Sequence, residues 1–263
     1  MPGRSLALPL LLAALALVSA CGSSTSSTPA SSTPPSSTPL HGSITVFAAA
    51  SLTGSFTRLG KQFEAAHPGT TVTFSFGASS TLAQQINQGA PADVFASAAP
   101  VNMQQVISDG GIATSTDFAS NTAELAVAPG KASTITSLAD LAKAGVRFAT
   151  CQPQVPCGAV ATKVLAHAHL TVQPVTQGLD VKTTLAYVTN GQVDAALVYV
   201  TDVKAAGSSV VGVPIPAAEN ASTEYPIGVV SASKNLDLAR AFDQYVLSGS
   251  GRSVLAAAGF SSP

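Results

Sequence analysis

The strongest constraint on the fold is a regular alternation of short β-type runs with helical stretches, from about residue 43 to residue 257. Near the start of this region, Phe56, Leu59 and Phe63 recur at helical spacing, and His67-Pro68-Gly69 ends the helix that they predict. Strands that alternate with helices form parallel sheets, because each helix crosses back over the sheet to reach the next strand. The sequence therefore predicts an α/β fold.

The alternation falls into two halves of similar size. The first half has predicted strands at Ser43–Phe47, Thr71–Phe76 and Asp93–Ala96, and predicted helices at Leu52–Ala66, Thr81–Asn87 and Val101–Ser108. The second half has predicted strands at Glu124–Ala128, Val146–Ala149, Val193–Val198, Ser209–Ile215 and Tyr225–Val230, and predicted helices at Leu138–Ala144, Ala159–His167, Val181–Thr189, Leu236–Leu247 and Arg252–Ala257. If the final segment returns to the first half, the chain forms two lobes joined by crossing strands.

Residues 1–20 have the pattern of a secretory signal peptide. Arg4 supplies a positive charge, and Leu6–Val18 is an almost unbroken apolar run that is shorter than the roughly 20 residues of a membrane helix. Val18-Ser19-Ala20-Cys21 resembles the bacterial lipobox, in which the Cys is acylated and becomes the new N-terminus. The alternative is an ordinary signal peptide with an incidental Cys.

A tether is predicted at residues 21–41. Between Ser23 and Pro39 every residue except Ala30 is Ser, Thr or Pro, so this stretch lacks the apolar side chains that would offset the entropy of ordering its backbone. We expect Cys21 to anchor a folded domain to the extracytoplasmic face of the cell membrane. Such an anchor suits a protein that captures and delivers a solute, and it suits a surface enzyme equally well.

The composition excludes some classes of partner. Charged residues make up 10% of the chain, against roughly 25% in typical soluble proteins. The formal net charge is −1 and the chain has no basic cluster, which argues against a nucleic-acid partner. The chain has no Trp, the usual platform for stacking sugars or bases. An anionic ligand would therefore have to be held by neutral hydrogen-bond donors.

Two cysteines remain once Cys21 is assigned to the anchor. They are Cys151 and Cys157, in Cys151-Gln-Pro-Gln-Val-Pro-Cys157. Because disulfides persist outside the cytoplasmic membrane, a disulfide between them is the favoured interpretation. A zinc site is disfavoured because no His has ligand spacing with either Cys, and a redox motif is disfavoured because the spacing is not Cys-x-x-Cys.

Two strand-to-helix junctions in the first half look alike. Ala48-Ala49-Ala50-Ser51 follows the first predicted strand, and Gly77-Ala78-Ser79-Ser80-Thr81 follows the second. Small residues allow close approach, and the free N–H groups at a helix start attract an anion without any cation. The alternative is that Ser51 and Ser79 each cap their own helix.

Four motifs resemble those of the bacterial molybdate-binding proteins of ABC transporters. They are Phe47-Ala-Ala-Ala-Ser51-Leu52, Phe76-Gly-Ala-Ser79-Ser-Thr-Leu82, Gly89-Ala-Pro91-Ala-Asp93-Val94-Phe95 and Leu197-Val-Tyr199-Val-Thr-Asp202. The resemblance covers residues 43–260 and includes Glu224-Tyr-Pro226. It implies a two-lobed periplasmic-binding-protein fold, each lobe a mostly parallel sheet flanked by helices, with the ligand in the cleft between the lobes. Lobe 1 is expected at residues 42–122 and 226–263 and lobe 2 at residues 123–225, with hinge strands near Ala123–Leu125 and Thr223–Pro226.

The resemblance also implies how an oxyanion is held. Ser51 and Ser79 are expected to donate hydroxyl and backbone N–H groups, and Tyr199 its phenol. In Pro156-Cys157-Gly158 and Asp180-Val181-Lys182, the backbone N–H groups of Cys157 and Val181 are expected to be donors. Cys157 departs from the family pattern, where a small Ala is common. No cofactor, and no metal other than that of the oxyanion itself, is implied.

The implied function is capture of molybdate, and of tungstate with it, for delivery to an ABC import permease by a monomeric protein. Molybdate only accepts hydrogen bonds, whereas monohydrogen phosphate must also donate one. Sulfate is acceptor-only but smaller, so a binding protein for sulfate is the nearer alternative. An acyl-serine enzyme is the remote one, because Ser231-Ala-Ser-Lys234 fits Ser-x-x-Lys without the motifs that accompany it in penicillin-binding proteins.

Overall fold

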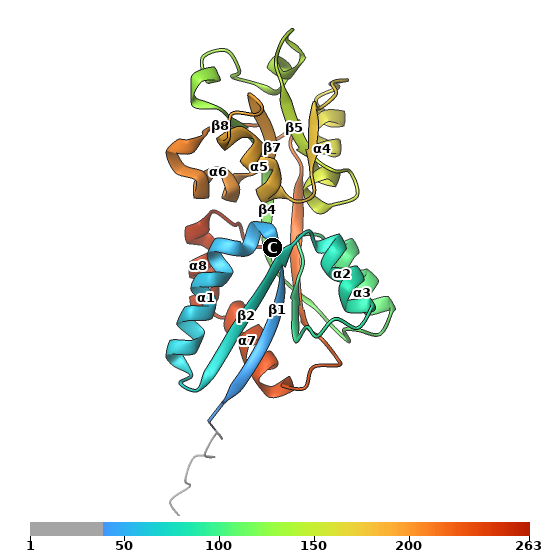
Figure 1. Ribbon diagram of the computed structural model, residues 1–263, viewed down its shortest axis with the longest axis vertical. Coiled ribbons are helices and arrows are strands. Elements are labelled where there is room, and N and C mark those ends of the chain that lie inside the picture. Colours follow the sequence, from blue (N-terminus) through green and yellow to red (C-terminus); the bar gives the residue numbers. More distant parts are fainter. Residues whose placement is uncertain (1–38) are drawn as a thin grey trace, which may run out of the picture. The chain divides into compact units, whose positions relative to one another are not determined.

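The computed structural model of the protein describes residues 39–263. The predicted signal peptide, Cys21 and most of the predicted tether lie outside the described residues. Residues 39–263 form a nine-stranded sheet with the strand order β2-β1-β3-β9-β4-β7-β5-β6, and β8 pairs with β4 (Figure 1). Within these residues, every helix is too short or too polar to cross a membrane. The α/β fold predicted from the alternation is confirmed.

The first lobe is built around three parallel strands. Its strands are β1 (Gly42–Ala49), β2 (Thr70–Gly77) and β3 (Val94–Ala96), and its helices are α1 (Thr53–Ala66), α2 (Ser79–Asn87), α3 (Pro100–Ser108), α7 (Leu236–Leu247) and α8 (Gly249–Ala258). Strand β1 pairs in parallel with both β2 and β3. Phe56 and Phe63 of α1 pack in edge-to-face contacts against Phe242 of α7. The last two helices, α7 and α8, thus belong to the same lobe as β1, the first strand.

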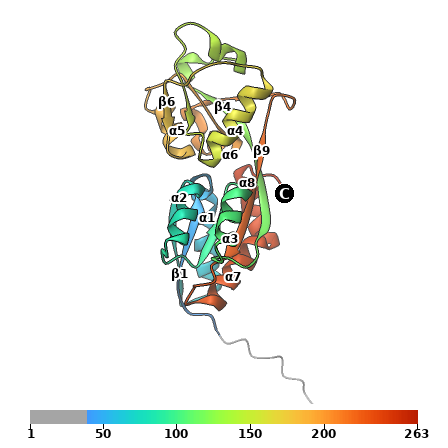
Figure 2. The same cartoon turned by 90° about the vertical axis from the view of Figure 1, so that its right-hand side faces the viewer.

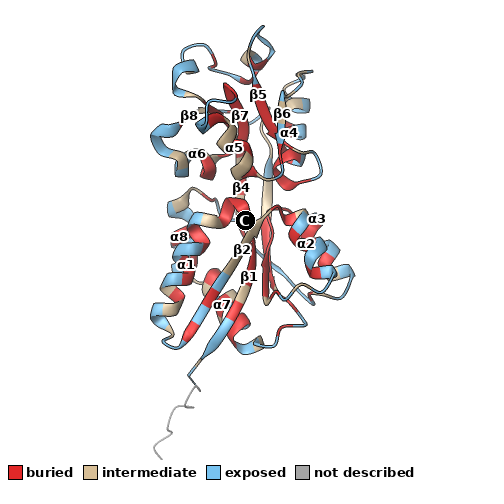
Figure 3. Ribbon diagram, in the orientation of Figure 1, coloured by how far each residue is buried: buried red, intermediate tan, exposed pale blue. Residues whose placement is uncertain are grey.

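The second lobe has its own core. Its strands are β5 (Phe148–Cys151), β6 (Thr176–Gly178), β7 (Ala195–Tyr199) and β8 (Val211–Pro214), and its α-helices are α4 (Pro156–His167), α5 (Val181–Thr189) and α6 (Val200–Ala206). Four short 3₁₀ helices complete the described elements, at Ala50–Leu52, Pro129–Lys131, Leu138–Ala142 and Gly207–Ser209. Strand β5 pairs in parallel with β6 and β7. Figure 3 shows this buried core around β5 and β7, separate from that around β1.

Two long strands connect the lobes. Strand β4 (Thr116–Val127) pairs antiparallel with β9 (Ser222–Val229) up to Thr122, and then with β7 and β8 from Ala123 onward. Figure 2 shows β4 and β9 where the two lobes meet. The segments predicted as hinges fall within these two strands, and their role in closure remains a prediction.

The observed elements differ from the predicted ones mainly in irregular segments. The predicted helix at Leu138–Ala144 is a 3₁₀ helix at Leu138–Ala142, and β6 was not predicted. Strand β4 begins at Thr116, eight residues before the predicted Glu124. Ser120 and Asn121 in its first part are poor strand formers, and the long pairing with β9 overrides that local preference.

Candidate functional site

A pocket lies where the two lobes face each other. The first lobe contributes residues 49–51, 77–79 and Ala98, and the second contributes residues 155–157, 180–181 and Tyr199. All five residues that the sequence singled out for an oxyanion line this pocket, namely Ser51, Ser79, Cys157, Val181 and Tyr199. The cavity volume of this pocket is about 20 Å³, and a single water needs roughly 10–15 Å³ on the same scale. The pocket therefore suits a compact ligand of a few heavy atoms.

The two serines of the first lobe present their hydroxyls at strand ends. Ser51 lies in the 3₁₀ helix that follows β1, and its Oγ is 2.9 Å from the phenol Oη of Tyr225. Ser79 begins α2, and its Oγ accepts a hydrogen bond of 2.9 Å from the N–H of Ala98. Within residues 39–263, neither hydroxyl caps its own helix. Because the Oγ of Ser79 already accepts from Ala98, its proton remains to be donated.

The second lobe presents two helix starts. Cys157 is the second residue of α4, and Val181 is the first residue of α5. The first N–H groups of an α-helix have no partner within the helix and carry partial positive charge. The carboxylate of Asp180 lies beside them but accepts the N–H of Thr183 at 2.8 Å as the cap of α5. The N–H groups of Cys157 and Val181 are therefore placed to serve a ligand.

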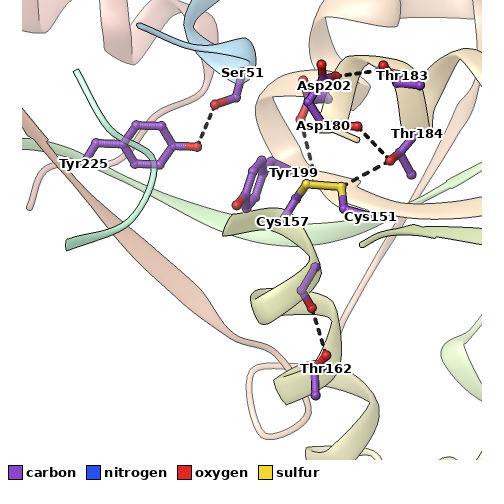
Figure 4. Close-up of a disulfide and its surroundings, with 11 residues drawn as sticks. Ser51, Cys151, Cys157, Thr162, Asp180, Thr183, Thr184, Tyr199, Asp202 and Tyr225 are labelled. Carbon is purple, nitrogen blue, oxygen red and sulfur yellow. Dashed lines mark hydrogen bonds between the residues drawn. A yellow bond between two sulfur atoms is a disulfide. The ribbon is translucent and has the colours of Figure 1, made fainter. Parts of the chain in front are cut away.

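A disulfide joins Cys151 at the end of β5 to Cys157 (Figure 4). The loop that it closes lies tightly against the start of α4. The closeness is seen at Gly158, where an added Cβ would lie 1.9 Å from the carbonyl oxygen of Gln152. The hydroxyl of Thr184 in α5 contacts the Sγ of Cys151 at 3.2 Å. These contacts hold the starts of α4 and α5 together beside the pocket.

Tyr199 is the remaining predicted donor. Its side chain is 1% exposed, and its Oη has no hydrogen-bond partner among residues 39–263. Burial is the main reason that the pKa of Tyr199 is raised, and the nearby Tyr225 and Asp202 raise it further. The phenol therefore stays protonated at neutral pH and retains one proton to donate.

An ion pair near the pocket lies outside its lining. The Nζ of Lys182 lies 3.0 Å from the Oδ1 of buried Asp202, whose Oδ2 accepts the N–H of Tyr199 at 3.2 Å. Burial raises the pKa of Asp202, and Lys182 opposes that shift. No Lys or Arg is among the residues that line the pocket, and residues 39–263 contain no cluster of His, Cys, Asp and Glu suited to a metal ion. The pocket thus presents neutral donors.

Comparison with known proteins assigns the chain to a family. Residues 44–261 match the family model described as bacterial extracellular solute-binding protein. The chain belongs to this family. Its members are solute-binding proteins rather than enzymes, and Ser231 and Lys234 of the Ser-x-x-Lys sequence are exposed and do not line the pocket.

Relatives of this solute-binding protein carry specific names. It is 40% identical over 246 residues to the molybdate-binding protein ModA of Mycobacterium tuberculosis, covering 93% of this chain and 92% of the relative. It is 35% identical over 216 residues to ModA of Escherichia coli, covering 78% of this chain and 83% of the relative. Among solved structures, the periplasmic molybdate-binding protein of Azotobacter vinelandii matches with a TM-score of 0.75 at 23% identity, covering 84% of this chain and 99% of that one. At that identity the structural likeness establishes the fold alone, which is the predicted two-lobed fold.

Sequence reasoning missed two residues that stand behind the pocket. Tyr225 contacts Ser51, and Asn121 contacts Tyr225 with its Nδ2 3.3 Å from the phenol oxygen. Glu224-Tyr-Pro226 is part of the family resemblance, but the motif by itself does not indicate a role for Tyr225. Neither Tyr225 nor Asn121 lines the pocket, so a search for ligand contacts does not find them.

Proposed function

We propose that this solute-binding protein captures molybdate, and tungstate with it, outside the cytoplasmic membrane and delivers it to an ABC import permease. The observation that carries the proposal is the donor set: two serine hydroxyls, a buried phenol that has no hydrogen-bond partner among residues 39–263, and two helix starts line one small pocket. The names of the relatives that cover most of the chain support the same ligand.

The donor set matches the chemistry of a fully ionised tetrahedral oxyanion. Such an ion has four oxygens that accept hydrogen bonds and no proton to donate. A hydrogen bond to a charged group contributes about 1.5–3 kcal/mol, so the proposed donors together are sufficient for micromolar or tighter capture. Helix starts add favourable charge without a cation. Monohydrogen phosphate would need an acceptor for its proton, and the one carboxylate in the pocket lining, that of Asp180, already uses its Oδ1 to cap α5.

Binding of another oxyanion is the second candidate. The sulfate-binding protein SubI of Mycobacterium tuberculosis has the same fold, with a TM-score of 0.72 at 20% identity over 84% of this chain and 86% of that one. The fold therefore serves more than one oxyanion, and pocket size must discriminate between molybdate and sulfate.

Titration calorimetry of residues 39–263 against molybdate, tungstate, sulfate and phosphate tests the proposal. Tight binding of molybdate and tungstate, with sulfate and phosphate silent, is the expected result. Binding of sulfate alone would change the proposed ligand to sulfate and leave the proposed site unchanged. Silence to all four anions would overturn the proposed function.

We further propose that the protein acts as a monomer held at the extracytoplasmic face by acylated Cys21. The full-length chain expressed in a bacterial host with a metabolic fatty-acid label should carry the label and sediment with membranes. Cys21→Ala should abolish both. Label that persists in the variant contradicts the anchor. Light scattering of residues 39–263 checks the monomer.

A further inference from the structure

The hydroxyl of Ser51 stands at the end of a buried chain of hydrogen bonds. The Nδ2 of Asn121 lies 2.8 Å from the Oγ1 of Thr201 and 3.3 Å from the Oη of Tyr225. The Oη of Tyr225 in turn lies 2.9 Å from the Oγ of Ser51, the contact drawn in Figure 4. This chain approaches the pocket from behind, since Ser51 is its only member among the lining residues.

The direction of the first link in the chain is set at Asn121. The N–H of Thr122 donates to the Oδ1 of Asn121 at 3.1 Å, so the other atom of the amide is the nitrogen. An amide nitrogen only donates, and therefore Tyr225 accepts from it. The phenol oxygen can accept a second hydrogen bond, so either hydroxyl can donate in the contact between Tyr225 and Ser51. When Tyr225 donates its single proton to the Oγ of Ser51, the proton of Ser51 is free to point into the pocket.

Burial preserves this arrangement. Tyr225 is 0% exposed and Asn121 is 2% exposed, so water does not compete readily for their polar atoms. Burial, above all, raises the pKa of Tyr225, and its phenol keeps its proton throughout the neutral range. Hydrogen bonds in such surroundings are stronger than in water and polarise one another.

The chain also ties the pocket to both connecting strands. Tyr225 lies on β9 and Asn121 on β4, which pair antiparallel in this region. Ser51 belongs to the first lobe, and Thr201 belongs to α6 of the second lobe. The chain of hydrogen bonds thus includes residues of both lobes and of both connecting strands.

We infer that Tyr225 and Asn121 are positioning residues that fix Ser51 as a hydrogen-bond donor toward the bound oxyanion. Neither residue lines the pocket. With Ser51 held in this way, the ligand meets a proton rather than a lone pair, and the hydroxyl loses less orientational freedom when the ligand binds. This inference rests on the proposed function, because it assigns a role in binding an acceptor-only anion.

A double-mutant cycle between Tyr225→Phe and Ser51→Ala tests the inference, with molybdate affinity measured by calorimetry. Tyr225→Phe alone should weaken binding about tenfold, which corresponds to roughly 1.4 kcal/mol. In the Ser51→Ala background the same change should have little further effect, because the hydroxyl that it positions is gone. Asn121→Ala, which leaves both hydroxyls, should weaken binding less and should also lose its effect in that background.

Tyr245→Phe is the matched control. It removes a phenol that contacts the Oε1 of Gln62 at 3.4 Å, outside the pocket lining, and it should leave affinity unchanged. Thermal unfolding of each variant verifies that it is folded.

Three outcomes would overturn the inference. If Tyr225→Phe lowers molybdate affinity equally in both backgrounds, its effect is a general structural one and does not act through Ser51. If Tyr225→Phe leaves affinity unchanged while Ser51→Ala weakens binding, Tyr225 has no positioning role, although the proposed site still holds. Wild-type protein that binds no oxyanion would overturn the inference and the proposed function together.

Discussion

The two sides of the pocket differ in how they offer donors. For the first lobe we propose the hydroxyls of Ser51 and Ser79, each held by a partner from another segment of the chain, together with the backbone N–H groups of the same two residues. For the second lobe we propose mainly backbone donors, the N–H groups at the starts of α4 and α5, with the phenol of Tyr199 as the one side-chain donor. Side-chain donors are lost by a single substitution, whereas backbone donors survive it. Substitutions should therefore weaken ligand binding more when they are made at donor residues of the first lobe than at most donor residues of the second.

The largest effect is expected from removing both hydroxyls of the first lobe. In Ser51→Ala with Ser79→Ala, two hydrogen bonds to a charged ligand are lost, and molybdate affinity should fall at least about 100-fold. Calorimetry measures the loss, and thermal unfolding should show a folded protein. Unchanged affinity would mean that the first lobe does not hold the anion by these side chains.

Tyr199→Phe removes the one side-chain donor proposed for the second lobe. The ring and its packing remain, so the variant should fold, while the loss of one charge-assisted bond should weaken binding by about tenfold to a hundredfold. Calorimetry against molybdate measures the change, and Tyr187→Phe provides a control at a tyrosine outside the pocket lining. Equal affinities for Tyr199→Phe and the control would leave the second lobe with backbone donors alone.

The disulfide variant Cys151→Ala with Cys157→Ala should separate stability from affinity. Loss of a cross-link across so short a loop should lower the free energy of unfolding by about 2–3 kcal/mol. Molybdate affinity should change only severalfold, because the N–H of residue 157 remains. Denaturant unfolding measures the free energy of unfolding, and calorimetry measures the molybdate affinity. A loss of affinity as large as that of the double serine variant would show that the loop, and not the N–H alone, determines binding.

The smallest effect is expected for Val181→Ala. This substitution keeps the N–H at the start of α5 and shortens a buried side chain, so unfolding should become easier by about 1 kcal/mol. Affinity for molybdate should change by less than about threefold, since the donor is backbone. A loss comparable to that of Ser51→Ala, measured by the same titration, would contradict the contrast between the lobes.

The candidate site was largely visible in the sequence because its donors lie at local features. A small-residue junction after a strand predicted Ser51 and Ser79 near helix starts, and the family resemblance added Cys157, Val181 and Tyr199. Local chemistry left two interpretations open for each serine, and the structure decides against helix capping. The partner that competes with capping lies in another segment of the chain in each case, so local chemistry does not identify it.

The sequence by itself determined the α/β class and most helices and strands, since periodic apolar positions report which face of an element is buried. Only the tertiary structure decided the length of β4 and the partners of its polar residues. Asn121 interrupts an otherwise plausible strand, and its role appears only when β9 and α6 lie beside it. Ser51 and Tyr225 are 174 positions apart. Periodicity specifies that a residue is buried, but a hydrogen-bond partner depends on strand register and lobe contacts, which no local pattern encodes.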